Sequence, residues 1–251
     1  MSPNGFTLTV VLPVRNRGGV RLDNCLKSLR WQQGVPHGSV EILVSDFGSN
    51  PEYREEIEKL GQQHGARVHF TPANGMWNRS RALNIGIKRA RGRLVLCTDV
   101  DMVFAPNFLR SALDVQAEAG ERALVLCQCI DLGEQTQGRV IDLPDLPELQ
   151  QGAVLRPSYG MGGCQCAPAS WFRRVRGFDQ GYRYWGAEDK DLVLRAKNDG
   201  LSIVWMTDRT TMMHQWHPSA QYDRPLLVRT NRLRLRLTSW IIRKNWLGWG
   251  E

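Results

Sequence analysis

Short runs of Val, Leu and Ile alternate with stretches of helical spacing through the first half of the chain. The apolar runs cover residues 7–13, 40–45, 67–71, 93–98 and 123–127. Helical patterns fill the intervals between them, at residues 23–33, 51–64, 78–91 and 106–119. This alternation builds a parallel sheet with helices on both faces, and continuous apolar strands are typical of a sheet that is covered on both sides. We therefore predict an α/β fold with a mostly parallel central sheet.

The alternation ends near residue 130. Residues 131–157 are rich in Pro, Gly and Gln and have no clear period, which predicts a long irregular loop. Shorter elements are expected after it, namely helices near residues 168–174 and 190–199 and strands at 202–206 and 210–213. A chain of 251 residues without a long linker is compatible with one large domain.

Excess positive charge is concentrated near the C-terminus. The chain has 33 Lys and Arg against 25 Asp and Glu, a net charge of +8. Seven of these cations, three Trp and no acidic residue lie within residues 224–250, so residues 1–223 are close to neutral. We expect one domain over 1–223, with halves at about 1–130 and 131–223, and a basic extension over 224–251 that is helical at 224–245. Such an extension can bind a membrane surface, nucleic acid or another polyanion.

Targeting signals are not visible in the sequence. The chain lacks the apolar run of about 20 residues that a membrane span requires, and its first residues lack the pattern of a secretory signal. We expect a cytoplasmic protein, with contact at the inner face of the membrane through residues 224–250 as a further option. In that reducing compartment the six cysteines are expected to be small buried residues, although two Cys-x-Cys pairs leave zinc binding open.

Two acidic residues follow the predicted strand at 93–98, as Asp99-Val100-Asp101. Alternate strand residues point to the same side, so the two carboxylates converge at the C-terminal end of the strand. That edge of an open parallel sheet binds ligands, and paired carboxylates beside a diphosphate can hold a hard divalent cation. Exposed carboxylates are also common at strand ends, so the pair alone does not establish a site.

Polar residues also close the first two predicted strands. Pro13 ends the first strand, Arg15 and Arg17 follow it, and Asp46 follows the second. Arginine has a forked donor group that suits a phosphate or a base carbonyl. Asp46 can accept hydrogen bonds from a base or a ribose, or it can simply form a turn or cap the helix that begins at residue 51.

A second acidic motif, WGAED at residues 185–189, precedes a helical pattern. Glu188 and Asp189 would lie in the first turn of that helix, where negative charge contributes about 0.3–1 kcal/mol of stability. A carboxylate near an acceptor hydroxyl can also act as a general base. Trp185 offers an apolar face against which a sugar ring can lie.

Two histidines follow the short strand expected at 210–213. His214 or His217, placed near a carboxylate pair, would complete a mixed oxygen and nitrogen site that suits Mn²⁺ and similar ions. Either imidazole can equally be an ordinary surface or core side chain. The residues by themselves leave both interpretations open.

Five segments, taken in chain order, resemble the motifs of a known enzyme family. They are PVRNR at 13–17, WNRSRALNIG at 77–86, DVD at 99–101, MGG at 161–163 and GFDQGYRYWGAEDKD at 177–191. Their order and spacing resemble metal-dependent, inverting GT-A glycosyltransferases of the family 2 type. The likeness is greatest to the β-1,4-galactosyltransferase family and to bacterial chondroitin-polymerase-type domains, and it covers roughly residues 7–217.

The resemblance implies a GT-A fold and a role for each matching residue. The implied donor-binding residues are Pro13, Arg15, Arg17, Asp46, Arg79 and Asp99. The implied metal is Mn²⁺ or Mg²⁺, with Asp101 and His214 as ligands and Asp99 contacting the ribose or the metal's shell. The implied acceptor and sugar pocket contains Gly162, Gly163, Trp185 and Glu188. Asp189 matches the catalytic base.

Three departures from the family pattern limit what can be carried over. Animal galactosyltransferases often place a Met ligand three residues before the matching His, where Thr211 stands here, and Ala187 replaces the second residue of a common Gly-Gly pair. Residues 45–49 are more like general family 2 transferases. The resemblance therefore implies transfer of a hexose or N-acetylhexosamine from a UDP-sugar to a carbohydrate or glycoconjugate hydroxyl, without specifying the sugar.

Other functions explain parts of the sequence. The isoelectric point near 9.5 and the basic extension suggest a nucleic-acid-binding protein, which leaves both acidic motifs unexplained. A transferase with a nucleic-acid or other polyanionic acceptor would combine the two features. A non-catalytic sugar-binding module is a third alternative, and the intact Asp99, Asp101, Asp189 and His214 argue against it.

Overall fold

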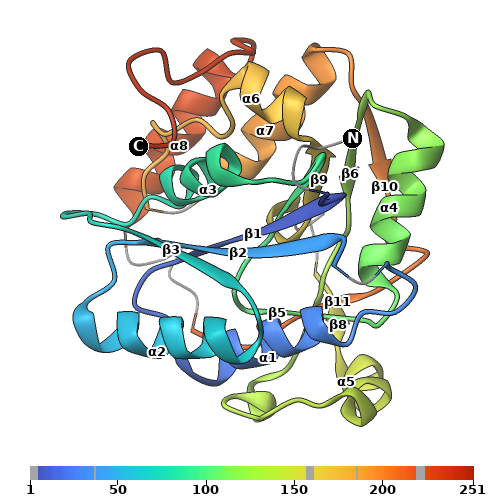
Figure 1. The fold of residues 1–251 in the computed structure, drawn as a ribbon. Coiled ribbons are helices and arrows are strands. Elements are labelled where there is room, and N and C mark those ends of the chain that lie inside the picture. Colours follow the sequence, from blue (N-terminus) through green and yellow to red (C-terminus); the bar gives the residue numbers. More distant parts are fainter. Residues whose placement is uncertain (1–4, 37, 157–160, 185, 219–223) are drawn as a thin grey trace.

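The computed structural model describes residues 5–36, 38–156, 161–184, 186–218 and 224–251. Its central sheet consists of β1 (Leu8–Val14), β2 (Val40–Phe47), β3 (Arg67–Thr71), β4 (Leu94–Cys97), β6 (Ala123–Leu126), β9 (Gln165–Pro168) and β10 (Ser202–Trp205). The strands lie in the order β10-β6-β9-β4-β1-β2-β3 (Figure 1). Only β9 is antiparallel to its neighbours, β4 and β6. The α/β fold with a mostly parallel sheet is confirmed.

Helices cover both faces of this sheet, as the alternating pattern predicts. They are α1 (Gly19–Arg30), α2 (Pro51–Gln63), α3 (Arg79–Arg89), α4 (Phe108–Ala119), α6 (Ala169–Val175) and α7 (Glu188–Asn198). In Figure 1, α1 and α2 lie below the central strands, and α3, α6 and α7 lie above them. Along β1, Val10 and Leu12 join the hydrophobic cluster under α1, whereas Val11 joins the cluster under α3.

A second, smaller sheet stands beside the first. It contains β5 (Met102–Phe104), β11 (Met212–His214), β7 (Ile130–Asp131) and β8 (Val154–Leu155), in that order. The segment predicted as an irregular loop at 131–157 therefore contains short strands, and it also contains α5 (Leu146–Gly152). That prediction is wrong because two-residue strands are too short to show a period. The pairing of β7 with β11 and of β8 with β7 specifies them instead.

The six cysteines are all buried and free. Five of them join the hydrophobic cluster under α1, and Cys97 joins the opposite cluster. Their expected role as small buried residues is confirmed. Burial raises the pKa of Cys166 to about 12, which keeps this thiol protonated.

The C-terminal segment packs against the rest of the domain. Its helix, α8 (Pro225–Thr238), lies against α7 and ends before residue 245, the predicted end. The chain then returns over the domain, where Ile242 and Trp249 join the cluster under α3. Lys244 is buried, with its Nζ 3.3 Å from an Asp179 carboxylate oxygen. Among the described residues, no helix has the length and apolar character needed to cross a membrane.

Candidate active site

The parallel strands β1, β2 and β4 end at the same edge of the central sheet, as their pairing register shows. The polar segments at 13–17, 46 and 99–101 therefore meet at this edge. Strand β11 brings His214 to the same place, because His214 pairs with Met102, the residue after Asp101.

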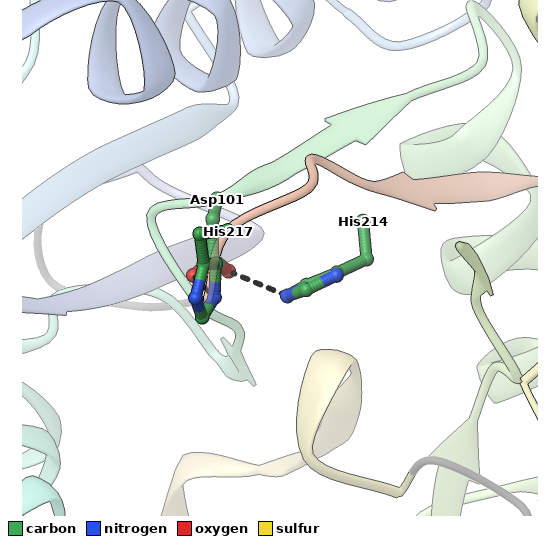
Figure 2. Close-up of side chains that lie close together, drawn as sticks. All are labelled: Asp101, His214 and His217. Atoms are coloured by element: carbon green, nitrogen blue, oxygen red, sulfur yellow. Dashed lines mark ion pairs between the residues drawn. The ribbon is translucent and has the colours of Figure 1, made fainter. Parts of the chain in front are cut away.

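Asp101, His214 and His217 form a compact cluster (Figure 2), in which one ligand atom from each lies within 4.8 Å of the others. Asp101 Oδ2 is 3.2 Å from His217 Nε2, and Asp101 Oδ1 is 3.9 Å from His214 Nε2. The Asp101 Oδ1 atom is buried and accepts no hydrogen bond from the described residues. One carboxylate and two imidazoles form a donor set that suits Mn²⁺ and similar divalent ions. These residues therefore fit the implied metal.

Positive charge around Asp101 keeps its carboxylate ionised. Burial acts to raise the pKa of Asp101, but the hydrogen bond with His217 and the charges of His214 and Arg17 hold it well below its ordinary value. Arg17 Nη1 lies 3.5 Å from Asp101 Oδ2. An ionised carboxylate is the form that binds a cation.

His214 is oriented by a residue that sequence reasoning missed. Asp131 lies beside His214 where β7 pairs with β11, and its Oδ1 is 3.1 Å from His214 Nδ1. Arg156 in turn donates to Asp131 through both Nε and Nη2 of its forked guanidinium. A carboxylate on one imidazole nitrogen directs the other nitrogen toward a metal. Nothing in the local sequence marks Asp131, because strand pairing alone brings it to this place.

Arg79, at the start of α3, joins the two acidic motifs. Its Nε donates to Asp99 Oδ1 at 2.7 Å, and its Nη1 donates to Asp189 Oδ1 at 2.8 Å. Its Nη2 donates to the carbonyl oxygen of Gly162 at 2.9 Å. The DVD, MGG and WGAED motifs therefore converge on one guanidinium.

Burial and crowding of negative charge shift the acids around Arg79. Burial, and then the charge of Asp189, raise the pKa of Glu188 to about 7, against the opposing effect of Arg79. Burial likewise raises the pKa of Asp99, with Asp101 adding to the shift and Arg79 opposing it. Glu188 therefore exchanges a proton near neutral pH.

The two MGG glycines allow this close packing. A Cβ at Gly162 would lie 2.4 Å from Asp189 Oδ2, and a Cβ at Gly163 would lie 2.7 Å from Met212 Cε. Thr98 Oγ1 donates to the Gly163 carbonyl oxygen at 2.6 Å. Any larger residue at 162 would displace the Asp189 carboxylate or the backbone that approaches it.

The departure at Ala187 has a visible backbone consequence. Ala187 precedes α7 with φ 79° and ψ −16°, in the left-handed region that favours glycine. An L-residue in that region costs roughly 1–2 kcal/mol. The common Gly at this position is thus explained by backbone geometry, and this chain places strain next to Glu188 and Asp189.

The predicted donor-binding residues lie along the sheet edge. Asp46 Oδ1 accepts the Ser49 N–H at 3.0 Å, which is the turn role weighed from the sequence. Asp46 Oδ2 is buried without a hydrogen-bond partner in the part of the chain that the structure describes, and burial raises its pKa. Arg15 Nη1 donates to the Gly75 carbonyl oxygen at 2.7 Å. Pro13 belongs to β1, next to these residues.

The structure thus brings together most residues singled out from the sequence, while Trp185 lies outside the described residues. Sequence reasoning missed Gln165, whose Nε2 is 3.3 Å from Asp189 Oδ1. The resemblance also implied only His214, and not His217, as the histidine ligand of the metal. If His217 is matched to the family's His ligand, the residue three positions earlier is His214, which stands where animal galactosyltransferases often have Met. That spacing was visible in the sequence.

Comparisons with known proteins bear on the family and the fold of this chain. The family model for "Glycosyl transferase family 2" matches residues 9–179, and the model for "N-terminal domain of galactosyltransferase" matches residues 154–217. The solved structure of GalNAc-T7 with UDP, GalNAc and Mn²⁺ has a TM-score of 0.69 at 16% identity, over 93% of this chain and 48% of that one. That of S. aureus TarS 1–349 with UDP has a TM-score of 0.62 at 18% identity, over 91% and 66%. These likenesses confirm the GT-A fold.

Curated relatives are similarly distant in sequence. The chain is 24% identical over 245 residues to validoxylamine A glucosyltransferase of Streptomyces hygroscopicus subsp. limoneus, covering 86% of this chain and 52% of the relative. It is 26% identical over 227 residues to chondroitin sulfate N-acetylgalactosaminyltransferase 1 of Homo sapiens, covering 86% and 42%. The chain spans about half the length of these relatives. Because the family 2 match extends over more than half of its residues, the chain belongs to glycosyl transferase family 2.

Proposed function

We propose that this chain transfers a hexose or N-acetylhexosamine from a UDP-sugar to the hydroxyl of a carbohydrate or glycoconjugate acceptor, with inversion. One observation carries the proposal: Arg79 binds both Asp99 and Asp189, so the DVD carboxylates and a candidate base belong to one site. Solved structures of this fold contain UDP, in one case together with Mn²⁺. The UDP bound in these structures supports a UDP-sugar as the donor.

Asp101, His214 and His217 are the residues that would hold a divalent cation. Two imidazoles favour Mn²⁺ over Mg²⁺, because Mg²⁺ prefers oxygen ligands. When bound, the cation would stabilise the negative charge that develops on the departing diphosphate. Asp99, paired with Arg79, would contact the ribose or lie in the cation's outer shell.

The nucleotide would lie along the edge formed by β1 and β2. Pro13, Arg15, Arg17 and Asp46 would hold the uridine part, with the free oxygen of Asp46 as a hydrogen-bonding position. Arg79 would add a positive charge near the nucleotide, between this edge and α7. Gly162 and Gly163 would allow the sugar to approach the backbone closely.

Asp189 would act as the general base. Its carboxylate would accept the proton of the acceptor hydroxyl while that oxygen attacks the anomeric carbon on the face opposite the diphosphate. The bond between the anomeric carbon and the diphosphate oxygen would break, UDP would leave, and the anomeric configuration would invert. Glu188, whose pKa is raised to about 7, would hold an acceptor hydroxyl in the pocket to which the resemblance also assigns Trp185.

Two isosteric variants test this assignment because they should fail at different stages. In calorimetry, Asp101→Asn should lose Mn²⁺-dependent UDP binding, whereas Asp189→Asn should bind UDP like the parent chain. In assays with a panel of UDP-sugars and acceptors, Asp189→Asn should lower kcat by about 10²–10⁴-fold, the usual contribution of a general base.

Asp114→Asn is the matched control, since Asp114 is a partly exposed residue of α4 that pairs with Arg110. It should bind and turn over substrate like the parent chain. Full turnover by Asp189→Asn would refute its role as the base. UDP affinity that is unchanged both by the removal of Mn²⁺ and by Asp101→Asn would refute the metal assignment.

A further inference from the structure

The outward side of α8 exposes large apolar side chains to water. Leu226, Leu233 and Leu237 are 71%, 56% and 61% exposed, and Trp240, just beyond the helix, is 70% exposed. Their helical spacing places them on one side, opposite the buried Asn231. We call this side, with the residues named above, the α8 outer face. An aligned apolar stripe on a soluble surface marks a contact site rather than scattered exposure.

Arginines flank the stripe. Arg229, Arg232 and Arg236 are exposed, and residues 224–250 contain no acidic residue to offset them. Two other cations of the segment point the opposite way: Arg234 binds Asp179 at 2.8 Å, and the buried Lys244 lies 3.7 Å from Asp191. The segment therefore divides its charge, with one group of cations used inside the fold and another presented outward beside the Leu and Trp side chains.

We propose that the α8 outer face docks onto an anionic lipid bilayer. Helices that lie in a membrane interface combine an apolar stripe of Leu and Trp with Arg or Lys at its border. The Leu and Trp side chains would enter the boundary between headgroups and acyl chains, and the arginines would contact lipid phosphates. Nucleic acid or another soluble polyanion would engage the arginines but leave the apolar stripe in water, so the stripe favours the bilayer.

Docking would leave the fold unchanged, because the inner side of α8 is already engaged. Asn231 Nδ2 donates to the Arg183 carbonyl oxygen at 2.9 Å, and Arg234 Nε donates to Asp179 at 2.9 Å. Both partners belong to the segment that leads into the WGAED motif. A docked α8 would therefore hold the acceptor end of the proposed active site at the bilayer, a consequence that rests on the proposed function. The docking itself does not depend on it.

Vesicle sedimentation of the full chain tests the proposal. We expect binding to vesicles of phosphatidylcholine mixed with phosphatidylglycerol, and weak binding to phosphatidylcholine alone. Arg229→Ala with Arg236→Ala should weaken partitioning by about thirtyfold, since each basic residue near the surface contributes about 1 kcal/mol. Leu233→Gln with Leu237→Gln should also reduce it strongly, although the charge is unchanged. Gln is a good helix former, so α8 should persist.

Exposed cations elsewhere provide the control, with Lys59→Ala and Arg93→Ala expected to partition like the parent chain. Brominated lipid should quench Trp fluorescence in the parent chain, and Trp240→Phe should remove most of that quenching. Thermal unfolding and UDP binding check that every variant folds, which separates failure of docking from failure of the proposed function.

Three results would overturn the proposal. The first is absence of binding to anionic vesicles. The second is binding that the Leu233→Gln and Leu237→Gln changes leave intact, because the apolar stripe would then not be inserted. The third is binding to heparin or single-stranded DNA without binding to either vesicle, which would assign the face to a soluble polyanion.

Discussion

Arg79 carries a charge imbalance at the centre of the site. Three carboxylates, those of Asp99, Glu188 and Asp189, lie within 3.9 Å of this single guanidinium. One cation does not balance three buried or half-buried acids. Burial is the main reason that the pKa values of Glu188 and Asp99 rise, and the neighbouring negative charges add to the rise. A site that is short of positive charge is prepared to accept a cation.

The raised pKa of Glu188 makes folding stability depend on pH. The pKa is about 7 in the folded state against an ordinary value of 4.5, so between these values the folded state binds more protons than the unfolded chain. The free energy of unfolding therefore falls as pH rises through this window, by up to about 3 kcal/mol from this group. Glu188→Gln should remove that loss, so the variant should gain stability relative to the parent at pH 8.5 and not at pH 4.

Urea unfolding at several pH values measures the effect. Glu121→Gln is the control, because the Glu121 side chain is 85% exposed, and it should leave the pH dependence unchanged. An equal fall in stability with pH for Glu188→Gln and for the parent chain would show that Glu188 is not the group responsible.

The sequence predicted which residues belong to the candidate site better than it predicted which side chains contact them. Asp99, Asp101, Asp189 and Arg79 could be named because their motifs are local and ordered. Asp131 could not, because its place beside His214 depends on a two-residue strand pairing with a segment far along the chain. Asp46 shows the intermediate case, since one of its oxygens serves the turn and the other is buried without a partner among the described residues.

Secondary structure was predictable where an element buries a long apolar run. The strands β1, β2 and β4 are fully or almost fully buried and read as continuous apolar segments. The strands of the smaller sheet have two to three residues each and carry no periodic signal. Their formation depends on tertiary pairing, and this sheet is the element that brings His214 to Asp101.

A substitution at Gly162 tests how tightly the elements of the site are packed. In Gly162→Ala the new Cβ would lie 2.4 Å from Asp189 Oδ2, so either the carboxylate or the backbone at 161–163 must move. A displacement of about 1 Å in a catalytic group can cost about 10²-fold in rate. We therefore expect kcat to fall by about that factor in sugar-transfer assays, with a much smaller effect on UDP binding.

Gly152→Ala is the matched control for this substitution. A Cβ at Gly152, the last residue of α5, meets no atom within 4 Å, so this variant should keep full activity. Thermal unfolding of both variants separates local displacement from loss of the fold. Wild-type kcat in a folded Gly162→Ala protein would show that the Asp189 position is not constrained by this contact.

The net charge of +8 is not distributed evenly over the molecule. Residues 1–223 are close to neutral, and the excess lies in the C-terminal segment. The sequence could locate that excess, but it could not show that the segment has two sides. Burial does so, because Lys244 is 4% exposed and faces Asp179 and Asp191, whereas Arg243, one residue earlier, is exposed beside Trp246.

The C-terminal segment should therefore be required for stability as well as for contact with a partner. Asp179 and Asp191 are 1% and 0% exposed, and deletion of residues 224–251 would remove Arg234 and Lys244 from beside them. Loss of one partner from a buried ion pair costs about 3–5 kcal/mol. We expect the deletion to abolish cooperative unfolding or to lower the free energy of unfolding by at least that amount in urea titrations.

Single substitutions separate the two sides of the segment. Lys244→Met removes the buried cation and should destabilise by several kcal/mol, although Arg195 and Arg234 still accompany the two aspartates, so the effect should be smaller than that of deletion. Arg243→Met removes a cation that lies 5.1 Å from the centre of the Trp246 ring and should cost no more than about 1 kcal/mol. Equal stability of the Lys244→Met and Arg243→Met proteins would contradict the division of charge. A loss confined to Lys244→Met would mean that part of the basic charge stabilises the fold and that only the outward arginines are available to a surface.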